Sequence, residues 1–408
     1  MGAIVYGEGT VFRVWAPNAE FIEIVGEFNQ WQEGSHPLEN EGSGYWYTDV
    51  PGAKPGQEYK YVIQYQGERF HRVDPYARQV VNSVGNSVIY DLNSFDWQGD
   101  QHQLSPHNEL VIYEMHIGSF TPGTDGKPGT FQDAILKFEH LQKLGVNVIQ
   151  VMPIAEFPGD YSWGYNPANI FAVESTYGGP DAYKHFVKEA HKAGFSVIQD
   201  VVYNHFGPTD LDLWRFDGWH EGEYGGIYFY NDERAITPWG ATRPDYGHPE
   251  VRQFIRDNVL MWLDEFHVDG LRFDSTLYIR TIDGNESNQL PEGFRMMADV
   301  NAEVLENHEH TILIAEDLRV NEAITAAVEQ GGAGFHAQWD ANFVHPIRSM
   351  IEAVADESRS MDLLKNLVTF KYNDDAFKRI IYSESHDEVA NGKARAPQEV
   401  DPQDPTSW

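Results

Sequence analysis

Four short segments contain the acidic and basic side chains whose spacing suits chemistry. They are Asp200-Val-Val-Tyr-Asn204-His205, Gly270-Leu-Arg272-Phe-Asp274, Ala315-Glu316-Asp317 and Ser385-His386-Asp387-Glu388. Each follows or ends an apolar run of strand length, so we expect all four at the carboxyl ends of parallel strands, where side chains converge on one site. One segment alone is weak evidence, because an Asp at a strand end is often a helix cap. In this order, the four predict one acidic site.

Two carboxyl groups on neighbouring strands suit the cleavage of a glycosidic bond. The oxocarbenium-like transition state needs one carboxylate below the anomeric carbon and one protonated carboxyl beside the leaving oxygen. Asp274 and Glu316 can supply these two groups. Arg272 lies two residues before Asp274 on the same face of a strand, so we expect it to lower the pKa of Asp274 and keep it ionised. A neighbouring carboxylate is expected to raise the pKa of Glu316, which then stays protonated as a general acid.

The other polar residues of the segments have supporting or ordinary roles. Asp387, with His386 and His205, is expected to hydrogen-bond sugar hydroxyls and to bind more tightly as charge develops on the ring. Asp317 is expected to cap a following helix. The 17 His residues include no helical ligand pair beyond what chance supplies, so we expect no metal site, and no motif implies a nucleotide cofactor.

Short apolar strands that alternate with amphipathic helices must position these residues. Strands are predicted at 111–117, 146–152, 196–201, 268–274, 311–316, 335–339 and 379–384. Helices are predicted at 131–144, 181–193, 249–266, 294–306, 320–330 and 343–355. This pattern favours an α/β fold of the (β/α)8 TIM-barrel type, with polar residues gathered where the strands end. The eighth strand is missing before Trp408, so we expect a fragment whose C-terminal portion, if it exists, would associate through the open barrel edge.

The pattern differs at the N-terminus. Runs at 11–15, 21–25, 45–50 and 59–65 alternate apolar and polar residues between Gly, Pro and Asn, which predicts an all-β, immunoglobulin-like sandwich over residues 1–95. Residues 96–110 are expected to be a linker, and 111–408 a truncated catalytic barrel. Residues 206–245, rich in Gly, Trp, Tyr and Asp, are too long for an ordinary loop and are expected to form a small excursion over the cleft.

Composition narrows the classes of function. The chain has no Cys, which excludes disulfides, thiolate metal sites and thiol nucleophiles. Lys+Arg 29 against Asp+Glu 63 gives a net charge of −34, which argues against nucleic acid or an anionic membrane as a partner. Eleven Trp and 21 Tyr suit a neutral, ring-stacking substrate such as a sugar. Because residues 1–10 lack the pattern of a signal peptide and no long apolar run occurs, we expect a soluble, cytoplasmic protein.

The four segments resemble the signature regions of the α-amylase superfamily of glycoside hydrolases, family thirteen. Phe12-Arg-Val-Trp-Ala-Pro17 and Val25-Gly-Glu-Phe-Asn-Gln-Trp31 resemble the carbohydrate-binding-type sandwich that precedes the barrel in branching and debranching enzymes. The resemblance implies an α-glucan substrate and a retaining double displacement. It also implies residue roles: Asp274 as nucleophile, Glu316 as acid/base, Asp387 as transition-state stabiliser, Tyr165 as aromatic platform, and Asp200, His205, Arg272 and His386 as lining of the cleaved sugar's subsite.

Individual segments resemble different members of this superfamily. Ser385-His-Asp-Glu-Val389, followed by Gly392-Lys393, is similar to glycogen branching enzymes. Glu156-Phe-Pro-Gly, Ser175-Thr-Tyr-Gly-Gly-Pro180 and 200–207 are similar to malto-oligosyltrehalose trehalohydrolase, which hydrolyses. Ser275-Thr-Leu-Tyr stands where calcium-dependent α-amylases commonly have Lys-His, which weakens the case for a calcium site. Asn204 matches a calcium ligand of those amylases, but in this chain we expect it to have a structural hydrogen-bonding role.

Three functions follow from these resemblances. A 1,4-α-glucan branching enzyme, which transfers the cleaved chain to a 6-hydroxyl, is the favoured one. Hydrolysis of α-1,4-glucans, of the α-amylase or trehalohydrolase type, is the alternative, and only the acceptor differs between the two. A glucan-binding protein without turnover is the third, and the presence of Asp274, Glu316 and Asp387 disfavours it.

Overall fold

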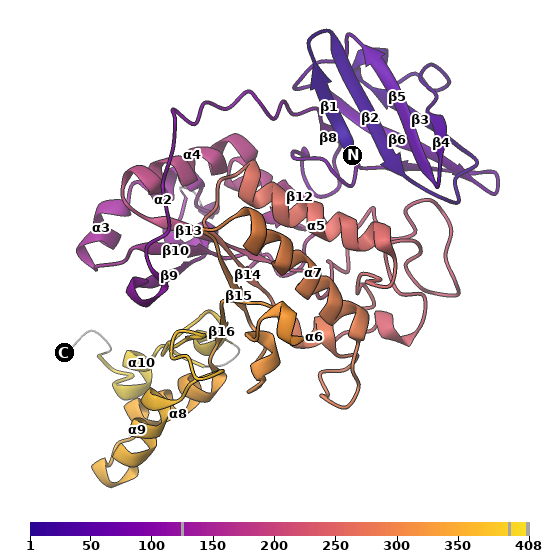
Figure 1. Cartoon of the computed structure of the whole chain (residues 1–408). Coiled ribbons are helices and arrows are strands. Elements are labelled where there is room, and N and C mark those ends of the chain that lie inside the picture. The colour runs from indigo at the N-terminus through magenta and orange to yellow at the C-terminus, as the bar shows by residue number, and fades with distance from the viewer. Residues whose placement is uncertain (124–125, 391–392, 405–408) are drawn as a thin grey trace.

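The computed structural model describes residues 1–123, 126–390 and 393–404, and it begins with a sandwich of two antiparallel sheets (Figure 1). One sheet has the order β1-β2-β5-β4, and the other has the order β3-β6-β7 with β8 beside β6. Alternation along the strands puts Phe12 and Val14 in the core between the sheets. The strands are β1 (Gly2–Tyr6), β2 (Gly9–Trp15), β3 (Phe21–Gly26), β4 (Glu39–Gly42), β5 (Tyr45–Pro51), β6 (Glu58–Tyr65), β7 (Glu68–Arg72) and β8 (Ser87–Val88). The four predicted runs are all strands.

Seven parallel strands form the second sheet, in the order β17-β16-β15-β14-β13-β10-β9. All seven predicted strands are confirmed, although several are shorter than predicted. They are β9 (Ile112–Met115), β10 (Val148–Val151), β13 (Ser196–Val201), β14 (Gly270–Phe273), β15 (Ile312–Ala315), β16 (Ala337–Trp339) and β17 (Arg379–Ile380). A small hairpin of β11 (Ala155–Glu156) and β12 (Asn169–Val173) follows β10.

The parallel sheet does not close in the described part of the chain, where β9 and β17 are its two edges. A cavity of about 400 Å³ lies between the edges, lined by Ile112 of β9 and by Arg379 and Ile380 of β17. Within the described residues, the expected barrel is therefore a curved sheet of seven strands without an eighth. Gly392 of the branching-type segment and Trp408 lie outside the described residues.

The helices follow the strands as in a βα-repeat. They are α1 (Ile117–Phe120), α2 (Phe131–Ile135), α3 (Phe138–Lys143), α4 (Gly179–Lys192), α5 (Pro249–Asp264), α6 (Thr276–Arg280), α7 (Pro291–Asn307), α8 (Ala341–Glu352), α9 (Met361–Thr369) and α10 (Ala396–Val400). The predicted helix 131–144 is two helices, because Lys137 leaves helical geometry with φ −107° and ψ 3°. Residues 206–245 contain only one 3-10 turn, at Glu233–Ala235, and otherwise loops.

The predicted helix at 320–330 is wrong. The chain forms only two 3-10 turns there, at Glu322–Ile324 and Val328–Gln330. Side chains from later in the sequence donate hydrogen bonds to carbonyl groups at the start of this segment. Gln338 donates to the carbonyl of Asn321 at 3.0 Å, and Asn373 donates to that of Glu322 at 2.9 Å. Tertiary contacts thus override the local apolar pattern.

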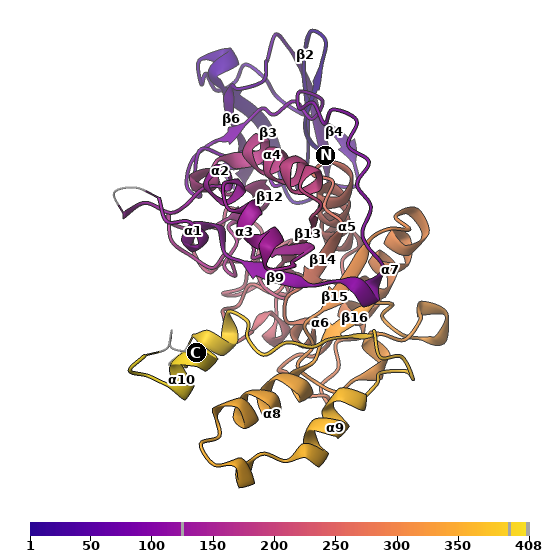
Figure 2. The same ribbon diagram turned by 90° about the vertical axis from the view of Figure 1, so that its left-hand side faces the viewer.

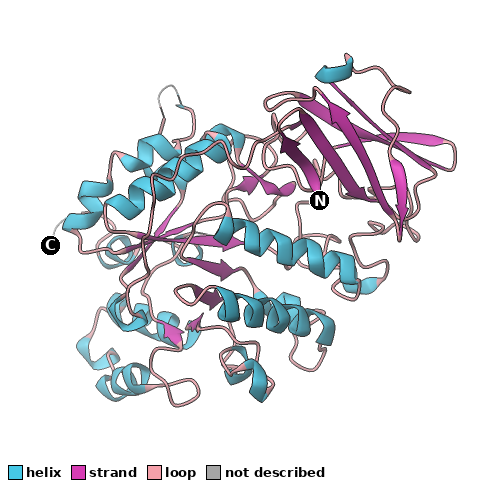
Figure 3. Ribbon diagram, turned by 45° about the horizontal axis from the view of Figure 1, so that its top comes forward, coloured by secondary structure: helices cyan, strands magenta, loops and turns pink. Residues whose placement is uncertain are grey.

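The sandwich packs against the parallel-sheet part at the end opposite to α8, α9 and α10 (Figures 1 and 2). Arg78 donates to both carboxylate oxygens of Glu265, at 2.9 and 2.6 Å, and Asn18 donates to Asp217 from its backbone at 2.9 Å. Helices flank the parallel strands (Figure 3), and α4, α5 and α7 are among them (Figure 1). In the described ranges, no helix is both long and apolar enough to cross a bilayer.

Candidate active site

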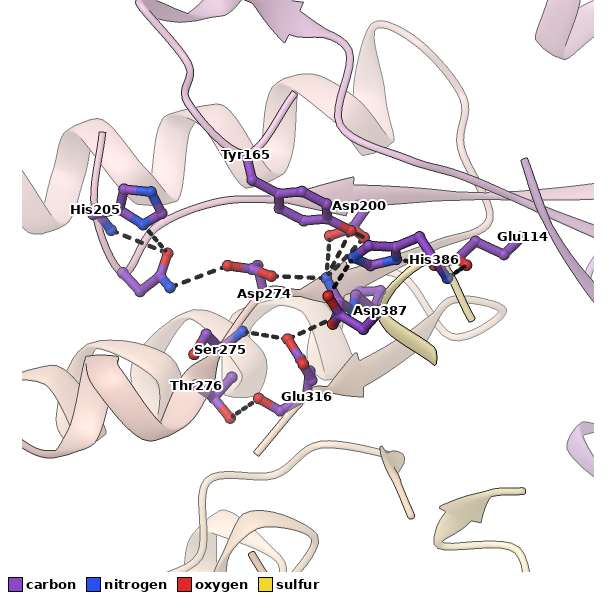
Figure 4. Close-up of polar contacts among 12 residues, drawn as sticks. Glu114, Tyr165, Asp200, His205, Asp274, Ser275, Thr276, Glu316, His386 and Asp387 are labelled. Carbon is purple, nitrogen blue, oxygen red and sulfur yellow. Dashed lines mark hydrogen bonds and ion pairs between the residues drawn. The ribbon is translucent and has the colours of Figure 1, made fainter. Parts of the chain in front are cut away.

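One buried guanidinium joins three of the predicted carboxyl groups. Arg272, on β14, donates through Nη1 to Asp200 at 2.8 Å and to Asp274 at 3.0 Å. Its Nη2 lies 2.7 Å from Oε2 of Glu316. Asp200 lies in β13, and Asp274 and Glu316 directly follow β14 and β15, so parallel pairing of these strands brings the groups together. Figure 4 shows them converging from neighbouring strand ends.

Burial dominates the pKa values of these carboxyl groups. It raises the pKa of Glu316 to about 8, Arg272 opposes this rise, and Asp274 and Asp387 add to it. It also raises the pKa of Asp274, although Arg272 lowers it, and raises that of Asp200 to about 6 against the same opposition. The expected signs of the Arg272 and carboxylate effects are confirmed. The expected net lowering of the pKa of Asp274 is wrong, because desolvation outweighs the ion pair.

Glu316 is oriented by the segment that follows Asp274. The backbone N–H of Ser275 donates to its Oε2 at 2.9 Å, and the N–H of Thr276 donates to its carbonyl oxygen at 2.8 Å. Ser275 has φ 41° and ψ 54°, a left-handed conformation that is unfavourable for a residue with a Cβ. This backbone turn directs the N–H groups of both residues at Glu316.

Asn204 and His205 lie on the other side of Asp274. Asn204 donates to Oδ2 of Asp274 at 3.0 Å, and its own Oδ1 accepts the backbone N–H of His205, also at 3.0 Å. The hydrogen-bonding role predicted for Asn204 is confirmed. The His205 ring is buried, stacks on Trp239 at 4.8 Å, and has its pKa lowered to about 4 by burial. It is therefore neutral, and its predicted contact with a sugar stays a prediction.

Tyr165 and His386 form the other wall of the site. The Tyr165 hydroxyl donates to Asp200 at 2.8 Å, and its ring stacks on His386 at 4.9 Å and 21°. His386 in turn donates its backbone N–H to Glu114 at 2.7 Å, and its Nδ1 lies 2.8 Å from the same carboxylate. One face of Tyr165 is thus covered by His386, so a sugar stacked on this ring would use its other face or displace the imidazole.

Asp387 is the most exposed of the predicted carboxylates. Its side chain is 47% exposed, and its Oδ1 lies 3.5 Å from Nε2 of His386. A cavity of about 670 Å³ adjoins this wall, lined by Glu114, Trp163 and His386 among other residues. The structure therefore groups Tyr165, Asp200, Arg272, Asp274, Glu316, His386 and Asp387, with His205 attached through Asn204 (Figure 4).

One group of side chains away from this site has metal-ligand atoms in proximity. His102, His191 and Asp269 have donor atoms within 4.8 Å of one another. However, the two imidazole rings are stacked nearly parallel, at 4.4 Å and 14°, so their nitrogen lone pairs do not converge on one point. His191 is instead held between Asp100 at 2.6 Å and Asp269 at 3.0 Å. These residues form a hydrogen-bonded cluster rather than a metal cage.

Sequence reasoning missed Glu114, Ser275 and Thr276. Glu114 lies on β9, and it faces the site from the strand edge opposite to β17. The rule that selected the other four segments, a polar residue near the carboxyl end of a buried strand, also applies to it. Ser275 and Thr276 act mainly through backbone groups, for which side-chain type gives no signal.

Two families match parts of the chain. The model of carbohydrate-binding module 48 (isoamylase N-terminal domain) matches residues 1–77, and that of the alpha amylase catalytic domain matches residues 112–224. A 1,4-alpha-glucan branching enzyme GlgB from Pseudoalteromonas atlantica is 32% identical, over 94% of this chain and 55% of its own length. The enzyme of the same name from Salinibacter ruber is 32% identical, over 96% of this chain and 66% of its own length.

Solved structures agree with this fold. A protein from Salmonella typhimurium, provisionally classed as an alpha amylase, superposes with a TM-score of 0.71 at 31% identity, over 86% of this chain and 55% of its own. A pullulanase from Bacillus acidopullulyticus, at 23% identity and a TM-score of 0.68 over 90% of this chain and 49% of its own, shares the fold. The chain thus spans between about half and two thirds of the length of these relatives.

Proposed function

This chain belongs to the α-amylase family of glycoside hydrolases, and from that premise we propose that it cleaves α-1,4-glucosidic bonds and transfers the released chain to a glucan 6-hydroxyl. Branching is the function named for the curated relatives, which match nearly the whole of this chain. A sandwich that matches a carbohydrate-binding module suits the same α-glucan substrate. Cytoplasmic location stays a prediction.

Asp274 is the proposed nucleophile and Glu316 the proposed acid/base. Glu316 protonates the leaving oxygen while Asp274 attacks the anomeric carbon, and Glu316 then takes a proton from the acceptor hydroxyl as the glycosyl–Asp274 bond breaks. The proposal rests above all on the pairing of both groups with Arg272, together with a Glu316 pKa of about 8 that keeps this acid protonated at neutral pH. Asp387 and His386 are proposed to bind sugar hydroxyls, and Tyr165 to stack on the ring.

Hydrolysis is the second candidate. The structural relative from Salmonella typhimurium is provisionally classed as an alpha amylase, and hydrolysis and branching use the same glycosyl intermediate. The difference lies in whether water or a sugar hydroxyl reaches that intermediate.

The test is incubation of amylose with the chain, followed by proton NMR. New α-1,6 linkages with few new reducing ends would support branching, whereas reducing ends alone would show hydrolysis. Asp274→Asn and Glu316→Gln are each expected to reduce either activity by at least about a thousandfold, because each removes a group that reacts covalently or transfers the proton. Asp264→Asn, a change of the same type on the exposed end of α5, is the matched control.

A further inference from the structure

Arg280 and Asp317, the residue after the proposed acid Glu316, form a buried ion pair. Asp317 follows Glu316 in the chain, and Arg280 ends α6. Nε and Nη2 of Arg280 donate to the two carboxylate oxygens of Asp317 at 2.8 and 2.6 Å. Both side chains are almost fully buried. Burying two charges is costly, and apolar residues of similar volume often stabilise a fold as well or better, so folding alone does not explain the pair.

Thr276 connects this pair to Glu316. Its hydroxyl oxygen lies 3.0 Å from Oδ2 of Asp317 and 3.1 Å from the carbonyl oxygen of Glu316. The Thr276 N–H donates to that carbonyl, and the preceding Ser275 N–H donates to Oε2 of the Glu316 side chain. One short segment therefore fixes both the backbone and one carboxyl oxygen of Glu316 (Figure 4).

The two chain turns next to the pair are in unfavourable conformations. Ser275 has φ 41° and Leu318, which follows Asp317, has φ 62°. Residues with a Cβ occupy this left-handed region at a cost in free energy, and they stay there when surrounding contacts require it. The Arg280–Asp317 hydrogen bonds join α6, which begins directly after Ser275, to the residue directly before Leu318.

We propose that Arg280 and Asp317 are a positioning pair that, through Thr276, holds Glu316 in the orientation for proton transfer. Oε2 of Glu316 accepts from the Ser275 N–H and lies beside Arg272, so Oε1 is the oxygen proposed to exchange the proton with the substrate oxygen. This inference rests on the proposed role of Glu316. It assigns to Asp317 a function other than the helix cap expected from the sequence.

Arg280 and Asp317 also place opposite charges near Glu316. Removing either charge should therefore shift the pKa of Glu316, which makes the role of the pair measurable. The other charged or titratable groups that act on Glu316 are Arg272, Asp274, Asp387 and Tyr382, and they stay in place when the pair is changed. Asp317→Asn removes a negative charge near Glu316, so the pKa of Glu316 falls and the basic limb of the kcat profile moves to lower pH. Arg280→Gln leaves Asp317 unpaired, so the same limb moves to higher pH.

Both variants are expected to lower kcat by at least about tenfold with KM changed by less than about threefold, because orientation of the acid acts in the transition state. Glu286→Gln is the matched control, since Glu286 contacts the same Arg280 at 2.5 Å from the exposed side without touching Thr276. Unchanged pH limbs in both variants, together with parallel losses of melting temperature, would show a purely structural pair and overturn the proposal.

Two further measurements keep the inference testable. If the charge variants do not fold, Thr276→Val removes the connecting hydroxyl without changing any charge, and it is expected to lower kcat where Thr276→Ser does not.

If the unaltered chain has no turnover, the proposed function fails, but the effect of the pair on Glu316 is still tested by thermal melting. The Tm difference between each form and the same form carrying Glu316→Gln, followed against pH, reports the titration of Glu316. Its midpoint should move in opposite directions in the two charge variants, and a constant midpoint would contradict the pair's effect.

Discussion

At the scale of single residues, Glu316 shows how burial prepares a carboxyl group for acid chemistry. Its folded-state pKa of about 8 lies above the usual 4.5, so the folded chain holds a proton that the unfolded chain releases. The stability contributed by this proton is complete below pH 4.5 and is lost as pH rises through about 8. Glu316→Gln is therefore expected to melt progressively higher than the unaltered chain as pH increases from 5 to 9. A Tm difference independent of pH would show an ordinary pKa.

The residue types of the site were predictable from sequence, but their electrostatic balance was not. Asp274, Glu316 and Arg272 were selected because each lies at or beside the end of an apolar strand. The burial that raises the pKa of Asp274 comes from the packing of the whole site, in which, for example, the Trp339 ring lies 4.2 Å from the Arg272 guanidinium carbon. Such long-range packing leaves no local pattern.

At the scale of elements, the Glu114–His386 pair connects β9 to the segment after β17, the two edges of the open sheet. Burial would raise the pKa of Glu114, but His386 holds it below 4.5. Burial would lower the pKa of His386, but Glu114 holds it above 6.5. The stabilisation from Glu114 is lost as pH falls through its lowered pKa, and that from His386 is lost as pH rises through its raised pKa. Both groups stabilise the fold fully between pH 4.5 and 6.5.

Glu114→Gln is accordingly expected to lower the Tm most between pH 4.5 and 6.5, and less as pH rises through the raised pKa of His386. Breaking a charge-assisted hydrogen bond between two largely buried side chains costs about 1–3 kcal/mol. Scanning calorimetry over this pH range measures the effect, and Glu109→Gln, an exposed glutamate just before β9, is the control. A loss of equal size at every pH would mean that Glu114 acts by packing alone.

Strands and helices with a strong hydrophobic periodicity were predictable from the sequence, and segments shaped by contacts with distant residues were not. The strands β13, β14 and β15 are fully buried and mainly apolar, and each was predicted near its observed position. Helix α9 was missed, and residues 320–330 were predicted as helix although they form only 3-10 turns, to whose start Gln338 and Asn373 donate side-chain hydrogen bonds. Hydrogen bonds from side chains remote in sequence are invisible to a periodicity argument.

At the scale of the whole molecule, the sandwich and the parallel sheet are joined by specific polar contacts. Arg78 pairs with Glu265 through two hydrogen bonds and lies over the Phe171 ring at 5.1 Å. Tyr76 also contacts Asp257, at 3.2 Å. Because these contacts fix the sandwich against α5 and β12, a glucan chain held by the sandwich would keep a constant position relative to the site.

The open sheet leads to the last prediction, which concerns unequal protection of its strands. Edge strands have backbone groups without a neighbouring strand, so they open more readily than central ones. Amide hydrogen exchange followed by mass spectrometry is expected to be faster by at least about tenfold in β9 and β17 than in β13 and β14, which have a partner on both sides. The cavity of about 400 Å³ between the edges gives water access to them. If a further segment of a longer chain completes the sheet, adding that segment should slow exchange in β9 and β17 while β14 stays unchanged. Equal protection of β17 and β14 in the chain alone would mean that this edge is already closed in solution, for example by a second copy.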